Sequence, residues 1–206
     1  MIAKADFDCA GDALPRPHPN CYWLGAGCVL AGEHPGAAGA EALARRLAAI
    51  EAAGVTLFVD LTAPGDPVLA YTPVAARRLS FAIPDFGLPG ADGLRRTLAA
   101  LLAEIGRGGL VYLHCKAGVG RTGTVAGCLL VEQGFAGDEA LALLQRKWAV
   151  AGQRAASART PETTAQERFI AGWELKRQAS MATTDLPSGR SPDRRGVNPG
   201  RRKATR

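Results

Sequence analysis

Aromatic residues, long apolar runs and paired cysteines are all scarce in this sequence. Aromatic side chains make up 6% of its 206 residues. Its longest apolar stretches, such as 125–131 with one glycine, fall far short of the about 20 residues that a transmembrane helix needs. The first twelve residues carry four charged side chains, where a secretory signal has an apolar segment. We therefore expect neither a membrane-spanning protein nor export by a signal peptide.

The five cysteines are an odd number, and no two of them have the CxxC spacing of a redox or zinc motif. This pattern argues against a disulfide framework and favours a reducing compartment. His18 and His34 lie in expected loops, without the clustered spacing of metal ligands. We expect a cytoplasmic protein with no metal and no cofactor.

Basic residues are concentrated near the C-terminal end of the chain. The formal charge is +6 and the pI is about 9.4. Residues 176–206 contain nine Lys or Arg against two Asp, whereas residues 1–175 contain 16 basic and 17 acidic side chains. The globular part is therefore nearly neutral, and its charge does not identify a partner.

Composition predicts three segments. They are an N-terminal extension at 1–20, one globular domain at 21–175, and a basic tail at 176–206. Gly, Pro, Ser and Arg dominate the tail without periodicity, so we expect it to be disordered. The tail can contact an acidic protein, a nucleic acid or an anionic membrane. The sequence carries no signature of an oligomeric state.

Strand and helix patterns alternate along the globular segment. The expected strands are 21–24, 28–30, 55–60, 79–83 and 110–114, and the expected helices are 38–53, 92–105, 121–132 and 138–148. A last helix should begin with Thr160 as N-cap and Pro161 at its first position, and run to about Leu175. Two of the strands are almost continuously apolar, which is typical of parallel strands buried on both faces. The sequence thus predicts an α/β fold with a central, mostly parallel sheet flanked by helices.

The segment 111–123 carries the chemical signal; it reads VYLHCKAGVGRTG and links a buried strand to a helix. A glycine-bearing loop at this place can turn successive N–H groups inward, which forms a nest for a tetrahedral oxyanion. The same N–H groups stabilise the thiolate of Cys115, the nucleophilic form of cysteine. Arg121 can offer two parallel donors to a phosphate. Thr122 places a hydroxyl near the sulfur, and His114 can hold the loop through its ring nitrogens.

This loop is not a Walker-type nucleotide loop, because no Gly-Lys-Ser/Thr follows its glycines. The Cys-x5-Arg spacing alone is a weak signal. The preceding His114, the glycines Gly118 and Gly120, and the following Thr122 make it strong. These residues resemble the cysteine loop of the protein tyrosine phosphatase superfamily, and of its small dual-specificity branch in particular. The resemblance covers roughly residues 21–173.

The resemblance implies a role for each residue of the site. Cys115 is the nucleophile, and the phosphate-binding residues are Lys116, Ala117, Gly118, Val119, Gly120 and Arg121. Asp85, in Ile83-Pro84-Asp85, resembles the general acid of a mobile loop, because a departing phenolate or alkoxide must be protonated. Gln166 resembles the glutamine that positions the hydrolytic water, and Gln153 in the preceding loop is a second candidate.

The implied activity is hydrolysis of phosphomonoesters through a cysteinyl-phosphate. Its substrates are proteins that carry phosphotyrosine as well as phosphoserine or phosphothreonine. No counterpart of the aromatic loop that deepens the pocket of tyrosine-specific relatives is found, which favours a shallower site. Asp85 is expected to act first as an acid and then as a base.

The sequence leaves other functions and other residue roles open. A phosphatase of phosphoinositides or other small phosphoesters is permitted by Lys116, although Val119 stands where relatives acting on inositol lipids carry a second basic residue. A non-catalytic phosphoprotein-binding module would normally lack the nucleophile, the arginine or the acid. The alternative for Asp85 is an ordinary turn residue, and the alternative for Gln166 is a solvated helix residue. Cys128 is expected in the core, with a redox partnership to the nucleophile as the alternative.

Overall fold

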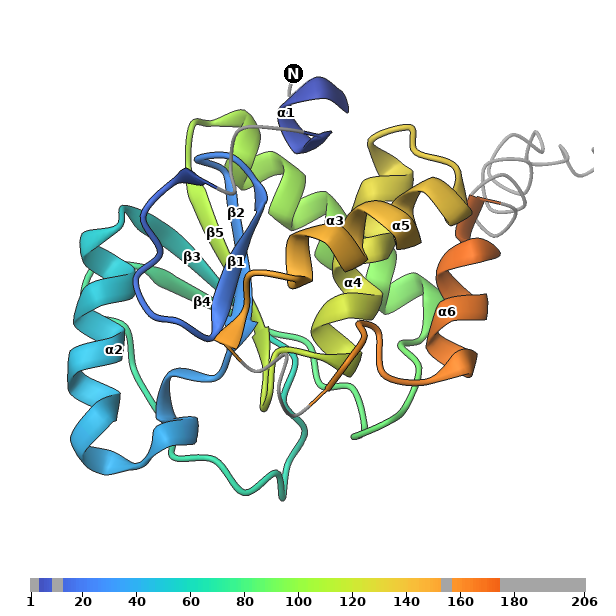
Figure 1. Ribbon diagram of the computed structural model, residues 1–206. Helices are drawn as coiled ribbons and strands as arrows, with labels where there is room; N and C mark the ends of the chain where they lie inside the picture. Colours follow the sequence, from blue (N-terminus) through green and yellow to red (C-terminus); the bar gives the residue numbers. More distant parts are fainter. Residues whose placement is uncertain (1–3, 9–12, 153–156, 175–206) are drawn as a thin grey trace, which may run out of the picture.

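The computed structural model describes residues 4–8, 13–152 and 157–174. A five-stranded sheet in the order β1-β2-β5-β3-β4 forms its centre. The strands are β1 (Cys21–Gly25), β2 (Val29–Glu33), β3 (Val55–Asp60), β4 (Arg77–Ser80) and β5 (Leu110–Cys115). β1 and β2 form an antiparallel hairpin, and the other three pairings are parallel. The predicted α/β architecture with a mostly parallel sheet is confirmed (Figure 1).

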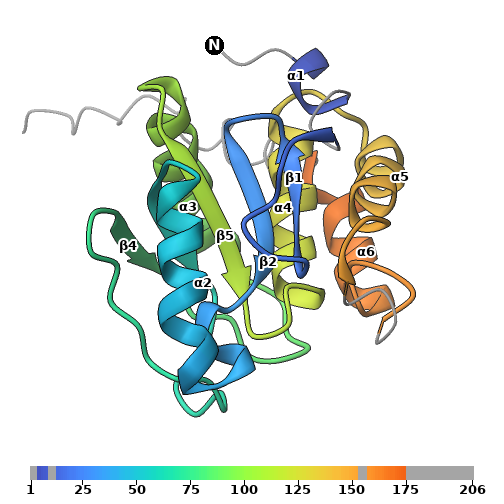
Figure 2. The same cartoon turned by 60° about the vertical axis from the view of Figure 1, so that its left-hand side comes forward.

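Helices cover both faces of the sheet. They are α1 (Lys4–Asp8), a 3-10 helix (Pro35–Ala38), α2 (Ala40–Ala52), α3 (Ala91–Gly106), α4 (Gly120–Glu132), α5 (Gly137–Trp148) and α6 (Thr164–Ala171). α2 lies on one side of the sheet and α3 to α6 lie on the other (Figures 1 and 2). No helix of the described ranges is long and apolar enough to cross a membrane.

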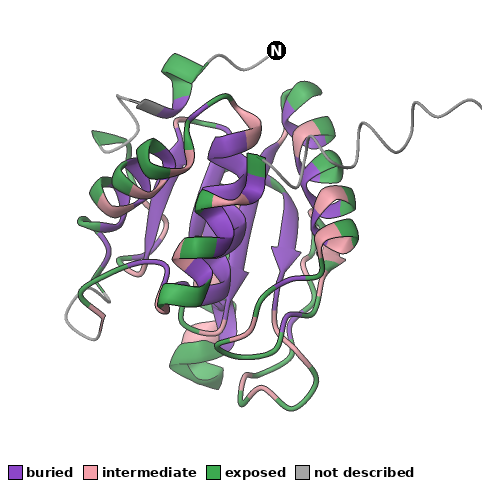
Figure 3. Cartoon of the chain, turned by 90° about the vertical axis from the view of Figure 1, so that its right-hand side faces the viewer, coloured by how far each residue is buried: buried purple, intermediate pink, exposed green. Residues whose placement is uncertain are grey.

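Successive residues of β5 point to opposite faces, as the two-residue period of a strand requires. Val111, Leu113 and Cys115 belong to the larger core beneath α3 to α6, whereas Leu110 and Tyr112 belong to the smaller core beneath α2. Nearly every residue of α4 is buried, which explains why its sequence is apolar on all sides. Figure 3 shows this buried centre in purple, with exposed residues on the outer helices.

The carboxyl ends of the parallel strands meet at one edge of the sheet. β5 ends at Cys115, which pairs in register with Glu33 at the end of β2. Asp60, at the end of β3, pairs in register with His114. Ligand sites of α/β proteins form at this edge, so the fold places the cysteine loop where a site is expected.

The fourth strand lies earlier in the sequence than expected. It spans Arg77–Ser80 rather than 79–83. Phe81 and Ile83 still donate backbone hydrogen bonds to Asp60 and Leu61, at 2.8 and 3.2 Å, but outside the regular strand. Pro84 then ends the pairing, because proline has no N–H to donate.

The last helix begins later than expected. α6 starts at Thr164 with Thr163 as its N-cap, so the prediction of Thr160 as N-cap and Pro161 as the first helical residue was wrong. The Thr160–Pro161 peptide bond is cis. The Thr160 hydroxyl donates instead to the carbonyl oxygen of Val119 at 2.9 Å, which ties this segment to the cysteine loop.

Residues before Cys21 also pack against the domain. The ring of Phe7 is fully buried, and His18 shares a hydrogen bond of 2.7 Å with the hydroxyl of Tyr112. The predicted tail at 176–206 lies outside the described residues, and so does Gln153.

Candidate active site

Residues 116–119 form the loop between β5 and α4, with Cys115 at its start. Cys115 is 2% exposed. Gly118 has a φ of 76°, in the left-handed region that favours glycine. A Cβ at this position would also collide with the carbonyl carbon of Gly32 in β2. The loop can therefore close over the sheet edge only with glycine at position 118.

Hydrogen bonds hold two carbonyl oxygens of this loop and that of Gly120, the first residue of α4. Those of Lys116, Val119 and Gly120 accept hydrogen bonds from His34 N, Thr160 Oγ1 and Thr124 Oγ1, at 3.1, 2.9 and 2.8 Å. Within the described part of the chain, the N–H groups of residues 116–119 donate no hydrogen bond. Unpaired amides at a helix N-terminus suit an anion, which supports the predicted phosphate nest.

The guanidinium of Arg121 lies between two carboxylates. Its Nη1 is 2.5 Å from Oδ2 of Asp66, and its Nη2 is 3.0 Å from Oδ1 of Asp85. Nη1 also donates to the carbonyl oxygen of Ile83 at 3.1 Å. Burial disfavours the charged guanidinium, but Cys115, Asp66 and Asp85 outweigh this effect and raise the pKa of Arg121. The side chain therefore remains a cation beside the cysteine.

A pocket of about 200 Å³ opens over the loop. Its lining residues are Asp85, Phe86, Cys115, Lys116, Ala117, Gly120, Arg121 and Glu162. The fold thus brings the predicted nucleophile, the predicted acid and four of the six predicted phosphate-binding residues to one cavity. A hollow of about 610 Å³ between β4 and α3 is larger, but its lining is apolar or arginine and includes no nucleophile.

Not all of the predicted phosphate-binding residues face this pocket. Val119 is 5% exposed and belongs to the apolar core, and Gly118 is buried against β2. Thr122 is fully buried, and its hydroxyl has no hydrogen-bond partner among the described residues. Cys128 is fully buried in the larger core, as expected.

The segment that carries Asp85 forms the rim of the pocket. The Asp85 side chain is 48% exposed, and its Oδ1 accepts a hydrogen bond from the N–H of Phe86 at 3.2 Å. Phe86 has a φ of 56° and is the one non-glycine residue with a positive φ in the described ranges. Strained backbone of this kind is typical of functional sites. The rim position suits a residue that must reach a leaving group.

Gln166 lies near the loop, but its amide is used within the protein. Oε1 accepts hydrogen bonds from the N–H groups of Glu162 and Thr163, both at 3.1 Å. Nε2 donates to the carbonyl oxygen of Gly87 at 3.2 Å. The side chain is fully buried and does not line the pocket. Gln166 therefore connects the segment before α6 to the segment that carries Asp85.

Sequence reasoning missed two acidic residues of the site, Asp66 and Glu162. Asp66 follows the carboxyl end of β3, and this position was an available signal because parallel strands end at one edge of the sheet. Glu162 lies four residues before Gln166, which was expected to position the water, and received no role. Burial and the nearby Asp85 raise the pKa of Glu162, while Arg121 lowers it.

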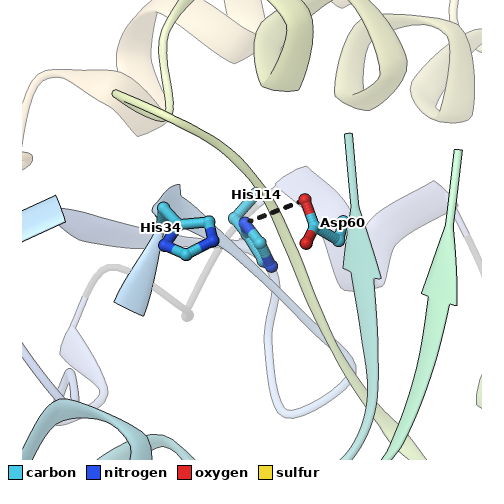
Figure 4. A group of neighbouring side chains, drawn as sticks. All are labelled: His34, Asp60 and His114. Atoms are coloured by element: carbon cyan, nitrogen blue, oxygen red, sulfur yellow. Dashed lines mark ion pairs between the residues drawn. The ribbon is translucent and has the colours of Figure 1, made fainter. Parts of the chain in front are cut away.

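His114 belongs to a buried polar cluster behind the loop (Figure 4). Its Nε2 lies 2.6 Å from the Tyr71 hydroxyl, and its Nδ1 lies 3.3 Å from the carbonyl oxygen of Cys115. Burial lowers the pKa of His114 to about 3, although Asp60 opposes the shift. The ring is therefore neutral at pH 7. The Tyr71 hydroxyl donates to Nε2, and the Nδ1–H points toward the loop carbonyl.

The side chains of His34, Asp60 and His114 approach one another as metal ligands do, with ligand atoms within 4.8 Å. Other groups already use these atoms. Asp60 Oδ1 accepts hydrogen bonds from the N–H and the hydroxyl of Thr62, and Oδ2 pairs with Arg78 at 2.5 Å. The rings of His34 and His114 pack edge to face, with their centroids 5.0 Å apart. We therefore interpret the cluster as hydrogen-bonded support for the loop.

Two features define the class of this protein as the cysteine-dependent phosphatases. They are the order of the strands and the loop that links Cys115 to Arg121 at the N-terminus of α4. Comparison with known proteins gives the family. Residues 18–170 match the family described as "Swiss Army Knife protein, DSP-PTPase phosphatase domain". The chain therefore belongs to this family and is a phosphatase of the tyrosine and dual-specificity type.

Solved structures and one curated relative agree with this assignment. Tk-PTP in its active form is 25% identical, with a TM-score of 0.61, over 77% of this chain and 98% of its own. A mouse protein described as a "putative dual specificity phosphatase", solved with zinc tungstate, is 20% identical, with a TM-score of 0.60. The match covers 84% of this chain and 96% of the mouse chain. "Putative tyrosine phosphatase 067L" of invertebrate iridescent virus 3 is 35% identical over 88 residues, which are 39% of this chain and 36% of the viral protein. The match therefore spans about a third of the viral protein.

Proposed function

We propose that this phosphatase hydrolyses phosphotyrosine, phosphoserine and phosphothreonine in proteins through a cysteinyl-phosphate on Cys115. One observation carries the proposal. Cys115, Arg121 and Asp85 line the same pocket of about 200 Å³, over a loop whose amides have no partner in the described chain. This set supplies a nucleophile, a cradle for the phosphate oxygens and a proton donor.

The first step transfers the phosphoryl group to sulfur. The Cys115 thiolate attacks phosphorus while the bond to the leaving oxygen breaks, and Asp85 gives that oxygen a proton. Arg121 Nη2 pairs with Asp85 in the free protein. A bound phosphate takes over this nitrogen and frees the carboxyl to face the leaving group, while Asp66 keeps hold of Nη1.

The second step releases the phosphate. A water molecule attacks phosphorus, the phosphorus–sulfur bond breaks, and the electron pair returns to the Cys115 thiolate. Asp85, now ionised, takes the proton of the water, as microscopic reversibility requires. Inorganic phosphate then leaves. The enzyme returns to its starting state without a further reactant.

The charge at the pocket rim favours protein substrates. Lys116 is the one lysine at the lining, which also contains two acidic residues, Asp85 and Glu162. Val119, at the position of the second basic residue in inositol-lipid relatives, is buried in the core. A headgroup with several phosphates would meet repulsion here. Phosphoinositides remain the alternative to test; PTPMT1, which shares the fold at 18% identity and a TM-score of 0.55, was solved with PI(5)P.

A substrate panel tests the proposal. Phosphotyrosine, phosphoserine and phosphothreonine peptides and phosphoinositides are compared with the wild type and with Cys115→Ser. We expect turnover of the peptides by the wild type, and none by the variant, which still binds phosphate. Higher turnover of the lipids would favour the alternative substrate class. Binding of phosphopeptides without turnover by the wild type would indicate a non-catalytic module.

A further inference from the structure

Glu162 brings a second carboxyl group to the edge of the pocket. It lines the same cavity as Asp85, and the two carboxyl groups lie close enough to interact electrostatically. Its N–H donates to Oε1 of Gln166 at 3.1 Å, which fixes its backbone. A Cβ placed on Gly120 would lie 3.0 Å from Oε2 of Glu162. The carboxyl group therefore lies directly against the first residue of α4, beside the floor of the phosphate loop.

The carboxyl group of Glu162 is free to bind something else. Within the described residues it makes no hydrogen bond and no ion pair. Asp85, in contrast, pairs with Arg121 at 3.0 Å. Burial and Asp85 raise the pKa of Glu162, and Arg121 lowers it. A carboxyl group in this position, facing the cavity and without a partner, is available to hydrogen-bond a water molecule.

Gln166 cannot offer an acceptor to that water. A carbonyl oxygen has two lone pairs, and both of those on Oε1 receive backbone N–H groups, from Glu162 and Thr163. Its Nε2 donates to the carbonyl of Gly87, and the side chain does not line the pocket. Gln166 is therefore a positioning residue that holds the Glu162 segment against the segment of the acid.

We infer that the Glu162 carboxylate accepts a hydrogen bond from the hydrolytic water and holds it in line with the Cys115–phosphorus bond. This inference rests on the proposed cysteinyl-phosphate. Glu162 acts only in the second step: one O–H of the water points to Glu162, and the other gives its proton to Asp85. The oxygen bonds to phosphorus as the phosphorus–sulfur bond breaks. Glu162 thus replaces Gln166 as the residue that touches the water.

A single-turnover experiment separates the two steps. Excess enzyme is mixed with an aryl phosphate, and the release of phenol and of inorganic phosphate is followed in the same time course. The variants are Glu162→Ala and Glu162→Gln, and Glu167→Ala is the matched control. Glu167 lies five residues further along the chain, in α6; it pairs with Arg159 at 3.3 Å and does not line the pocket.

In Glu162→Ala we expect phenol release within twofold of the wild type and phosphate release slowed about tenfold, so that a lag separates the two. Acid quench during the lag should trap the cysteinyl-phosphate. Glu162→Gln, which keeps an acceptor oxygen, should show a smaller lag, and Glu167→Ala should show none beyond that of the wild type. Melting temperatures near that of the wild type confirm that the variants are folded.

The inference is overturned if neither Glu162 variant lengthens the lag, or if phenol and phosphate release slow together. Failure of the proposed function would look different. In that case the wild type itself would transfer no phosphoryl group to Cys115, or Cys115→Ser would retain turnover.

Discussion

Asp66 and Arg121 are 55 residues apart in the sequence, yet Asp66 Oδ2 lies 2.5 Å from Nη1 of the guanidinium. Both side chains are nearly buried, with 10% and 2% of their surfaces exposed. The same carboxylate oxygen accepts a hydrogen bond from the N–H of Ala63 at 3.2 Å, which fixes its own position. Asp66 therefore sets the orientation of Arg121 before any phosphate arrives.

Replacing Asp66 should weaken catalysis without removing any group that contacts the substrate. In Asp66→Asn, Arg121 loses the charged partner that holds its Nη1, and with it the orientation in which the guanidinium can donate two hydrogen bonds to a phosphate. We expect kcat/KM for aryl phosphates to fall about tenfold, equivalent to about 1.4 kcal/mol of transition-state stabilisation. Asp92→Asn is the matched control, because Asp92 is 84% exposed and pairs only with Arg95 among the ion pairs of the described ranges. Equal effects of the two substitutions on kcat/KM would show that Asp66 does not orient Arg121 for catalysis.

The proposed role of Asp85 as general acid predicts that its replacement affects turnover differently for different leaving groups. Asp85→Asn should lower turnover of phenyl phosphate about 100-fold, because its poor leaving group needs a proton. Turnover of dinitrophenyl phosphate, whose leaving group is stable as an anion, should fall much less. The measurement is the slope of log kcat against leaving-group pKa for wild type and variant. Parallel slopes would show that Asp85 is not the general acid.

The geometry of the loop predicts that position 118 tolerates no side chain. Gly118→Ala adds a methyl group at a φ of 76° and against the backbone of β2. We expect a loss of about 3 kcal/mol of stability and a melting temperature lower by about 10 °C. Gly106→Ala is the control, because a Cβ there has no atom within 4 Å. A wild-type melting temperature for Gly118→Ala would contradict this description of the loop.

Two buried histidines predict acid sensitivity. Burial lowers the pKa of His114 to about 3, and burial with Arg46 and Arg16 lowers that of His18 to about 4. Both residues titrate near 6.5 in an unfolded chain, so below that pH the unfolded state binds more protons than the folded state. Each histidine should therefore cost about 1.4 kcal/mol of stability per pH unit as the pH falls from 6.5 toward 4.

Urea denaturation at pH 7.5 and pH 5 measures this effect. His18→Gln should reduce the difference between the two pH values, because one of the titrating groups is gone. The hydrogen bond from His18 to Tyr112 is lost as well, so stability at pH 7.5 should also fall. Equal free energies of unfolding at both pH values in the wild type would show that these histidines are not held neutral.

Local sequence patterns predicted those strands and helices whose apolar pattern follows directly from their burial. Residues 55–60 form a strand as expected, because an almost continuous apolar run fits a strand covered on both faces. The last helix was misplaced because Thr160 and Thr163 are both good N-caps in isolation. The choice between them depends on a contact 41 residues away, from the Thr160 hydroxyl to Val119.

The candidate site was predictable where its residues are consecutive. Cys115 to Arg121 are consecutive residues from the end of β5 to the start of α4, so their closeness follows from the local chain. Glu162 reaches the same pocket, and Asp66 reaches the guanidinium of Arg121, only through the path of the chain before α6 and after β3. Sequence similarity suggested a water-positioning role for Gln166, but the two backbone N–H groups that occupy its oxygen become visible only in the folded protein.

The most direct test of the account is to find the phosphoryl group on the enzyme. The wild type is mixed with labelled aryl phosphate, quenched in acid within the first turnover and digested, and the labelled peptide is identified by mass spectrometry. We expect label on Cys115 in the wild type, and neither label nor turnover in Cys115→Ser. Label on another residue, or turnover that survives Cys115→Ser, would contradict it.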